Sequence, residues 1–263
     1  MSNTATVLAF DFGASSGRAI RAVYDGQNLT YEEIHRFENV PIEKDGHLCW
    51  DVETLLKEIH TAIQKAGTFD SLGFDTWGVD FGLLDTDGHL LANPVHYRDA
   101  RTNGKPEQAA ARMPAEELYA HTGNQIMAIN TLFQLLALRE QDPELLQKAE
   151  QILFMPDLFA ALLGAEPVCE RSIASTSQML DPRTGQWSRE VLAAYGLKEN
   201  HFAPLVASGT VTGTLTTGAK IIAVAGHDTQ CASAAMPCAE EDVEHTAFLS
   251  CGTWSLLGTE LDT

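Results

Sequence analysis

Basic residues are scarce in this chain of 263 residues. Lysine and arginine together number 17, against 36 aspartate and glutamate residues, and the formal net charge is −19 at pH 7. A surface of that sign repels nucleic acid and anionic lipid, so we expect neither a nucleic-acid partner nor a membrane partner. A phosphorylated ligand would have to be bound locally, by backbone N–H groups, a cation or a well-placed arginine.

Cysteine pairs, long apolar runs and several catalytic motifs are also missing. The five cysteines include no CxxC pair, which argues against a disulfide framework or a zinc site. No apolar run approaches the ~20 residues that span a bilayer. The first residues lack the basic start of a signal peptide, and the expected location is the cytoplasm. HExxH, GxSxG, GxGxxG and the P-loop pattern do not occur, so the Rossmann and P-loop interpretations lose their main support.

The order of the predicted elements indicates the fold class. Strands are predicted at residues 6–12, 18–24 and 29–37, a helix at 52–66, and a further strand at 71–77. A Rossmann domain would alternate strand and helix from the start. Three consecutive strands, a helix and a strand instead indicate an α/β domain of the actin-like (ribonuclease H-like) class, with a mixed sheet and flanking helices.

The middle of the chain is predicted to be mostly helical, and its end repeats the pattern of its beginning. Strands at 246–251 and 253–259 are joined by a tight turn, as the first two strands are. They indicate the start of a second domain of the same class, which makes the sequence a fragment. The remaining predicted elements are helices at 105–120, 131–140, 143–150, 155–163, 188–195 and about 229–235, and a strand at 220–224.

The first of four polar segments is DFGASSGR, residues 11–18. Small residues after the first strand let the backbone approach a phosphate closely, and hydroxyl groups add donors. Arg18 can form a fork to phosphate oxygens, and Asp11 is placed to hold a water of a Mg²⁺ ion. A glycine-rich hairpin turn without any ligand explains the same pattern. The small residues are Ala14, Ser15, Ser16 and Gly17.

The second segment is GHDTQ, residues 226–230, and it places Asp228 at a strand-to-helix junction. Loop residues at such junctions commonly face a cleft, and a helix N-terminus stabilises an anion. The alternative is that Asp228 only caps the helix.

The third and fourth segments are DTWGVDFG, residues 75–82, and YRDARTNG, residues 97–104. Trp77 beside Gly78 and Asp80 offers an apolar ring face with nearby acceptors for sugar hydroxyls. A core tryptophan in a hairpin is the alternative. For the fourth segment the alternative is a surface ion-pair cluster.

Together these segments resemble the FGGY carbohydrate kinases, in the same order and over nearly the whole chain. The specific forms are DFGASSGR, DTWGVDFGLLD, YRDARTNG, AGHDT and SCGTWSLLG. Where most of the family has Trp-x-Asp-x-Arg, this chain has Tyr97-x-Asp99-x-Arg101. The resemblance implies a phosphotransferase that uses ATP and Mg²⁺, while the family's adenine-binding segment is absent from this sequence.

The resemblance also implies roles for individual residues. Asp11 and the segment Ala14–Arg18 match the first phosphate motif of the family, and Thr253 matches the second. Gly78 and the segment His227–Thr229 match sugar-contacting positions, with Asp228 as the general base. Residues 1–244 would then form the sugar-binding domain and 245–263 the beginning of a truncated ATP-binding domain.

The implied reaction is the phosphorylation of L-rhamnulose to L-rhamnulose 1-phosphate in L-rhamnose catabolism. Another ketose or polyol, such as L-fuculose or xylulose, is the alternative acceptor. The alternative class is a non-catalytic module that binds sugar or nucleotide, and we expect residues 1–263 alone to be inactive. The expected small-molecule partners are therefore a ketose and ATP.

Overall fold

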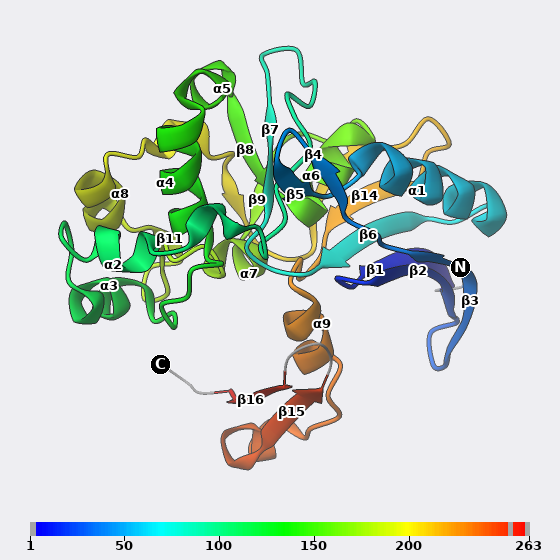
Figure 1. The fold of residues 1–263 in the computed structure, drawn as a ribbon. Helices are drawn as coiled ribbons and strands as arrows, with labels where there is room; N and C mark the ends of the chain where they lie inside the picture. The colour runs from blue at the N-terminus through cyan, green and yellow to red at the C-terminus, as the bar shows by residue number, and fades with distance from the viewer. Residues whose placement is uncertain (1–3, 252–254, 261–263) are drawn as a thin grey trace.

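A six-stranded mixed sheet forms the centre of the computed structural model, which describes residues 4–251 and 255–260 (Figure 1). Its order is β13-β14-β6-β1-β2-β3. Strands β1, β2 and β3 pair antiparallel, β1 pairs parallel with β6, β6 pairs parallel with β14, and β13 closes the edge antiparallel to β14. The predicted fold class is confirmed. The strands are β1 (Ala5–Phe12), β2 (Ser16–Tyr24), β3 (Leu29–Glu38), β6 (Ser71–Thr76), β13 (Thr210–Thr214) and β14 (Lys220–Ala223).

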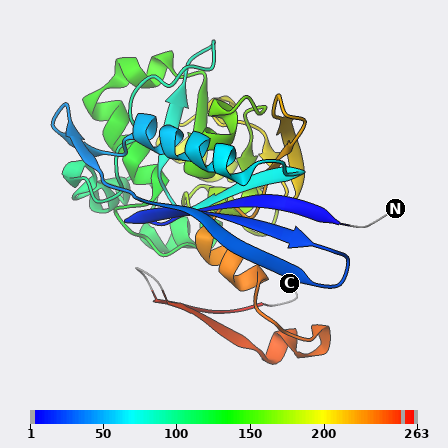
Figure 2. The same cartoon turned by 90° about the vertical axis from the view of Figure 1, so that its right-hand side faces the viewer.

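Helices cover both faces of this sheet. Figures 1 and 2 show α1 and α6 on one face and α9, followed by the β15–β16 hairpin, on the other. Among the helices described, none is both long and apolar enough to cross a membrane. The helices are α1 (Val52–Ala66), α2 (Lys105–Ala109), α3 (Ala115–Thr122), α4 (Thr131–Gln141), α5 (Pro143–Lys148), α6 (Met155–Leu162), α7 (Arg171–Ser175), α8 (Arg189–Tyr195) and α9 (Asp228–Ala234), with 3₁₀ turns at Ala100–Thr102, Glu199–His201 and Glu240–His245.

Short two-stranded pairs complete the fold. The predicted hairpin near the end of the chain is present as β15 paired antiparallel with β16. Of the predicted turn Cys251-Gly252, Cys251 ends β15 and Gly252 lies outside the described residues. The short strands are β4 (Ile42–Lys44), β5 (His47–Cys49), β7 (Phe81–Leu84), β8 (Gln151–Phe154), β9 (Cys169–Glu170), β10 (Leu180–Asp181), β11 (Gln186–Trp187), β12 (Leu205–Val206), β15 (Ala247–Cys251) and β16 (Ser255–Thr259).

Aromatic packing between the sheet and α6 sets the position of β1. Phe10 and Phe12 are two residues apart in the strand, so their side chains lie on the same face of the sheet, and both are fully buried. Phe10 stacks on Phe74 of β6 with ring centroids 4.8 Å apart, and Phe12 stacks on Phe159 of α6 at the same distance. Because this face of β1 is buried, the register that places Asp11 at the strand end is strongly specified.

The predicted elements differ from the structure mainly where helices end. The helix at 52–66 has the predicted bounds, and Asp51 caps it by accepting from the Thr54 N–H. The helix predicted at 105–120 is two helices, α2 and α3, because Pro114 interrupts the run. The helix predicted to reach residue 150 ends at Lys148, because β8 follows at once and pairs with β7. Strand β7 is buried along its whole length and β8 from Ile152 onward, so neither shows the alternation of buried and exposed residues that identifies a strand.

Gly17→Ala is expected to destabilise the fold by about 1–3 kcal/mol. A Cβ at this position would lie 2.3 Å from Cζ of Phe37, its cross-strand partner. Phe37 is itself buried, edge-on to Phe12, and cannot withdraw freely. Urea denaturation of the two proteins would measure the difference. In a Phe37→Leu background the same substitution should cost less, and an equal cost in both backgrounds would contradict the steric account.

Candidate active site

The predicted phosphate-binding turn is a closed loop between β1 and β2. The Gly13 N–H donates to the Ser16 carbonyl at 2.8 Å. Asn39, which is only 3% exposed, holds the turn from outside: its side chain donates to the Gly13 carbonyl at 2.9 Å and its N–H to the Ser15 carbonyl at 3.0 Å. Strand β2 begins at Ser16, two residues before the predicted start at Arg18. The turn is therefore short, and its backbone shape is fixed by hydrogen bonds.

Arg18 and Asp11 form an ion pair at the base of this turn. They are cross-strand neighbours in β1 and β2, and Nε and Nη2 of Arg18 donate to Oδ2 of Asp11 at 2.8 and 2.6 Å. Both side chains are partly exposed, at 44% and 32%. Phosphate binding is predicted for Arg18 and a hydrated cation for Asp11, as separate roles. In the structure the two side chains form one unit, so a ligand bound at the turn meets an ion pair.

A second carboxylate, Asp75, lies beside Asp11. The two residues are Cα partners in the parallel pair β1–β6. Burial, together with the charges of Asp11 and Asp228, raises the pKa of Asp75 to about 8, while Arg18 opposes the shift. The sequence analysis named the segment but gave Asp75 no role. The available signal was that Asp75 is a carboxylate near the end of a predicted strand, followed by Thr76 at the end of β6.

The GHDT segment lies against the end of β6. The Gly226 carbonyl accepts from the Thr76 N–H at 2.9 Å, and His227 forms a parallel bridge with Thr76. A Cβ built at Gly78 would lie 3.3 Å from Nε2 of His227. The structure thus brings together two segments, 76–78 and 226–229, that were predicted separately as sugar-binding.

Asp228 begins α9 with its side chain 40% exposed. Its Oδ1 accepts from the Thr229 N–H at 2.5 Å and from the Thr229 hydroxyl at 3.1 Å, and lies 3.5 Å from Nε2 of His227. Burial lowers the pKa of His227, against the charges of Asp228 and Glu170. A neutral imidazole therefore stands beside a solvent-accessible carboxylate, which is an arrangement suited to accepting a proton.

Trp77 and Asp80 lie in the core behind this segment. Trp77 is 5% exposed and packs on Trp50 with ring centroids 3.9 Å apart. Asp80 is 1% exposed and accepts from both indole N–H groups, at 2.6 Å from Trp50 and 3.1 Å from Trp77. The Tyr97 N–H and Gln134 side chain also donate to it. Burial still raises the pKa of Asp80 to about 6, against these four hydrogen bonds.

Sequence reasoning missed Trp50 and Gln134, because both reach Asp80 from distant parts of the chain. The role of Trp77 and Asp80 as direct sugar contacts stays a prediction. What the structure shows is that they pack behind Gly78 and are covered on their other sides.

Val79, between Gly78 and Asp80, has a positive φ of 68°. A β-branched residue in this region costs about 1–3 kcal/mol and persists only where its surroundings hold it. Its N–H donates to the Thr176 hydroxyl at 3.0 Å, and its carbonyl accepts from the Thr131 hydroxyl at 2.7 Å. The turn that carries Gly78 is therefore held in a strained shape from two sides.

The Tyr97-x-Asp99-x-Arg101 segment ties loops to the core. Asp99 accepts from the Leu48 N–H and the Arg101 N–H, each at 2.9 Å. Arg101 donates to Oε1 of Gln134 at 2.8 Å, the same amide that donates to Asp80. The predicted alternative of a surface cluster of ion pairs does not describe this segment.

The prediction that Asp11 holds a water of a Mg²⁺ ion stays a prediction. Its carboxylate is an oxygen ligand of the kind that Mg²⁺ prefers, and its Oδ2 is bound by Arg18. Across residues 4–251 and 255–260, however, only the exposed turn residues Asp85, Asp87 and His89 bring three ligand atoms within 4.8 Å of one another. Thr253, the predicted second phosphate contact, lies outside the described residues.

The mixed sheet, the short turn after β1 and the carboxylate at the strand-to-helix junction define one domain of an actin-like ATPase fold. The model of the FGGY family of carbohydrate kinases, N-terminal domain, matches residues 6–234, and the chain belongs to this family.

The chain is 42% identical to a rhamnulokinase of Bacteroides thetaiotaomicron over 268 residues, which cover 97% of this chain and 55% of that protein. It thus spans about half the length of the curated relative it matches. Two solved structures share the fold at low identity. A carbohydrate kinase from Novosphingobium aromaticivorans has a TM-score of 0.77 at 21% identity, covering 98% of this chain and 56% of its own. A ligand-bound xylulose kinase from Lactobacillus acidophilus has a TM-score of 0.72 at 17% identity, covering 87% and 49%.

Asp75→Asn is expected to become more stabilising, relative to wild type, as the pH rises from 5 to 8. The folded chain keeps the Asp75 proton up to a pKa of about 8, whereas the unfolded chain loses it near pH ~4. Between these values the folded state binds more protons, so the free energy of unfolding falls with rising pH, and asparagine removes this loss. Urea denaturation at pH 5, 6.5 and 8 would measure it.

Asp25→Asn is the matched control. Hydrogen bonds from Asn28 and Gln27 lower the pKa of Asp25, so its proton is gone in both states across this pH range. Its effect on stability should not change between pH 5 and 8. The same flat profile for Asp75→Asn would contradict the raised pKa.

Proposed function

We propose that the protein carrying this chain transfers the γ-phosphoryl group of ATP to L-rhamnulose, giving L-rhamnulose 1-phosphate and ADP in L-rhamnose catabolism. The 42% identity to a rhamnulokinase across 97% of the chain carries the choice of substrate. The geometry around Asp228 supports the type of reaction. Residues 1–244 are proposed as the sugar-binding domain, and residues 245–263 as the beginning of the ATP-binding domain. The proposed location is the cytoplasm.

Asp228 is the proposed general base. Its partly exposed carboxylate lies next to His227 and Thr229, and the bridge between His227 and Thr76 holds it near Gly78. These residues would hold the sugar with its primary hydroxyl toward the γ-phosphorus. The hydroxyl oxygen then forms the new bond to phosphorus, the bond to the β-phosphate oxygen breaks, and the proton passes to Asp228. Such transfers need in-line positioning and charge stabilisation more than covalent help.

The turn Ala14–Arg18 is proposed to hold the phosphates of ATP, together with Thr253. Local donors are needed because the chain as a whole is strongly acidic. Arg18 contributes charge, while its pairing with Asp11 keeps both side chains oriented. Mg²⁺, when bound through water at Asp11, would neutralise part of the phosphate charge.

Asp228→Asn is expected to lower kcat by ~10²–10⁴-fold while the KM for ATP changes little. Asparagine keeps the shape of the side chain but cannot accept the proton. A coupled assay of ADP release by the full-length protein would measure this with L-rhamnulose, with L-fuculose and xylulose as comparison substrates. Near-normal turnover by the variant would exclude Asp228 as the base, and a preference for another ketose would exclude the proposed substrate.

Variants of Trp77 distinguish a ring that contacts the sugar from a ring that only packs in the core. Trp77→Phe keeps most of the packing against Trp50 but removes the indole donor to Asp80. If the ring contacts the sugar, the KM for L-rhamnulose rises while the melting temperature changes little. If the ring only packs in the core, the reverse is expected: a lower melting temperature with a KM within about twofold, and for Trp77→Ala a loss of ~3–5 kcal/mol of stability.

A further inference from the structure

We propose that Glu170 is a positioning residue for the candidate base, and that its buried carboxylate holds the loop that carries Asp228. The proposal rests on the function proposed for Asp228. Glu170 ends the short strand β9 and is 1% exposed. It was not singled out in the sequence, because its partners come from three separate segments.

Both carboxylate oxygens of Glu170 accept hydrogen bonds from the protein. Oε2 accepts from the Ser172 N–H at 2.9 Å, the Ser172 hydroxyl at 2.6 Å and the Ile173 N–H at 3.2 Å. It also accepts from the Gly226 N–H at 3.0 Å, and Oε1 accepts from the Ser208 hydroxyl at 2.6 Å. All five partners are donors, so the site suits a group that only accepts.

Part of this set is the cap of the helix that follows. The N–H groups of Ser172 and Ile173 open α7, and Glu170 caps them as many helix starts are capped. The bonds to Gly226 and Ser208 lie outside the helix, at sequence separations of 56 and 38 residues. Capping alone needs neither of them, so the carboxylate joins α7 to the loop after β14.

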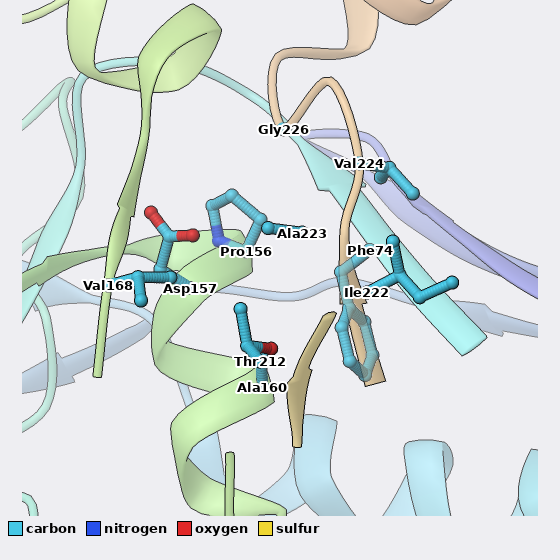
Figure 3. A pocket seen from close by; sticks show the side chains of 10 residues that line it. All are labelled: Phe74, Pro156, Asp157, Ala160, Val168, Thr212, Ile222, Ala223, Val224 and Gly226. Carbon is cyan, nitrogen blue, oxygen red and sulfur yellow. The ribbon is translucent and has the colours of Figure 1, made fainter. Parts of the chain in front are cut away.

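Gly226 is restrained by hydrogen bonds at both its N–H and its carbonyl, and by close packing. Its N–H donates to Glu170, while its carbonyl accepts from Thr76 of β6 at 2.9 Å. A Cβ at position 226 would lie 2.9 Å from Cγ of Pro156 and 3.3 Å from Cβ of Ile173. Figure 3 shows the loop with Gly226 passing over the Pro156 ring. Position 226 therefore has no room for a side chain toward α6, and a glycine is needed there.

His227, the next residue of the loop, is also hydrogen-bonded to this group of side chains. The Ser172 hydroxyl donates to Glu170 and accepts from the His227 N–H at 3.4 Å. Asp228 follows directly, so Glu170 is linked to it through the fixed backbone of Gly226 and His227. A small displacement of a catalytic group can cost about a hundredfold in rate, which gives a buried anchor at this place a functional consequence.

Asp157 provides a natural comparison for Glu170. It is also a buried carboxyl, and burial raises its pKa well above the usual range. It accepts from the Glu170 N–H at 3.1 Å, and it lines a cavity of about 10 Å³ together with Pro156 and Gly226, which are labelled with it in Figure 3. Such a cavity is at the lower limit for one water molecule. No hydrogen bond in the described part of the chain joins the Asp157 side chain to residues 226–229.

The test uses Glu170→Gln in the full-length protein. The side chain keeps its size but places a donor where five donors converge. We expect kcat to fall ~10–100-fold while the KM for ATP stays within about twofold. Amide hydrogen exchange in a peptide covering 225–230 should accelerate about tenfold or more, while exchange in α1 stays unchanged.

Three further variants locate the effect. Ser172→Ala removes the link to His227 and should lower kcat in the same direction by a smaller factor. Ser208→Ala removes only a donor to Oε1, and Asp157→Asn changes a neighbouring buried carboxyl, so both should leave kcat within about twofold.

Several results would overturn the proposal. One is a normal kcat in Glu170→Gln although exchange at 225–230 is faster, and another is unchanged exchange there. Faster exchange throughout the chain, with activity lost only in proportion to unfolded protein, would show a purely structural role. If Glu170→Gln does not fold, a normal kcat in Ser172→Ala would overturn it instead. Failure of the base assignment is separate, because it would show as turnover by Asp228→Asn with the exchange results unchanged.

Discussion

The parallel pairing of β1, β6 and β14 is the constraint on which the candidate site depends. Parallel strands in one sheet end at the same edge, so whatever follows each strand meets its neighbours there. Asp11 and Asp75 are therefore neighbours near the ends of β1 and β6. Gly226 lies beyond the last residue of β14, and its carbonyl accepts from the Thr76 N–H of β6. Three segments separated by more than 60 residues each thus reach one place without any long loop.

This arrangement places several carboxyl groups in and around the site, and each has a different set of partners. Asp11 pairs with Arg18, whereas Glu170 and Asp80 are buried and surrounded by donors. Asp75 has fewer partners, and its pKa rises to about 8, against about 6 for Asp80 with its four donors. Burial disfavours the charged form of a carboxyl group, and hydrogen bonds to the carboxylate oppose that shift. The side chain of Asp228 stays partly exposed.

The sequence predicted those parts of the site that are local in the chain. The turn after the first strand, the strand-to-helix junction at Asp228 and the α1 helix each depend on neighbouring residues, and short patterns reveal them. The strands β7 and β8 were missed because continuous burial removes the alternation that identifies a strand.

The supporting residues could not be predicted in the same way. Gln134 and Glu170 are ordinary polar residues in sequence, next to no recognisable motif. Their importance follows from contacts with residues 54 and 56 positions away, and these contacts exist only once the fold has formed. Trp77 has the same limit: its neighbours in sequence suggested a sugar platform, with a core tryptophan as the alternative, and only the fold shows that Trp50 packs against the ring and that it is 5% exposed.

The two strained or crowded positions of the site, Val79 and Gly226, have the same kind of support. Each is a backbone segment whose N–H and carbonyl are both bound by groups from other elements, through Thr176 and Thr131 in one case and Glu170 and Thr76 in the other. Thr176, Thr131 and Glu170 come from the helical region between β7 and β13, which contributes no strand to the central sheet, whereas Thr76 belongs to β6 of that sheet. That region therefore does more than cover the sheet. It restrains the backbone at Val79, next to Gly78, and at Gly226, two residues before Asp228. The ends of the parallel strands place the site residues, and the helical region restrains their backbone. The geometry of the site therefore depends on the packing between the sheet and that region.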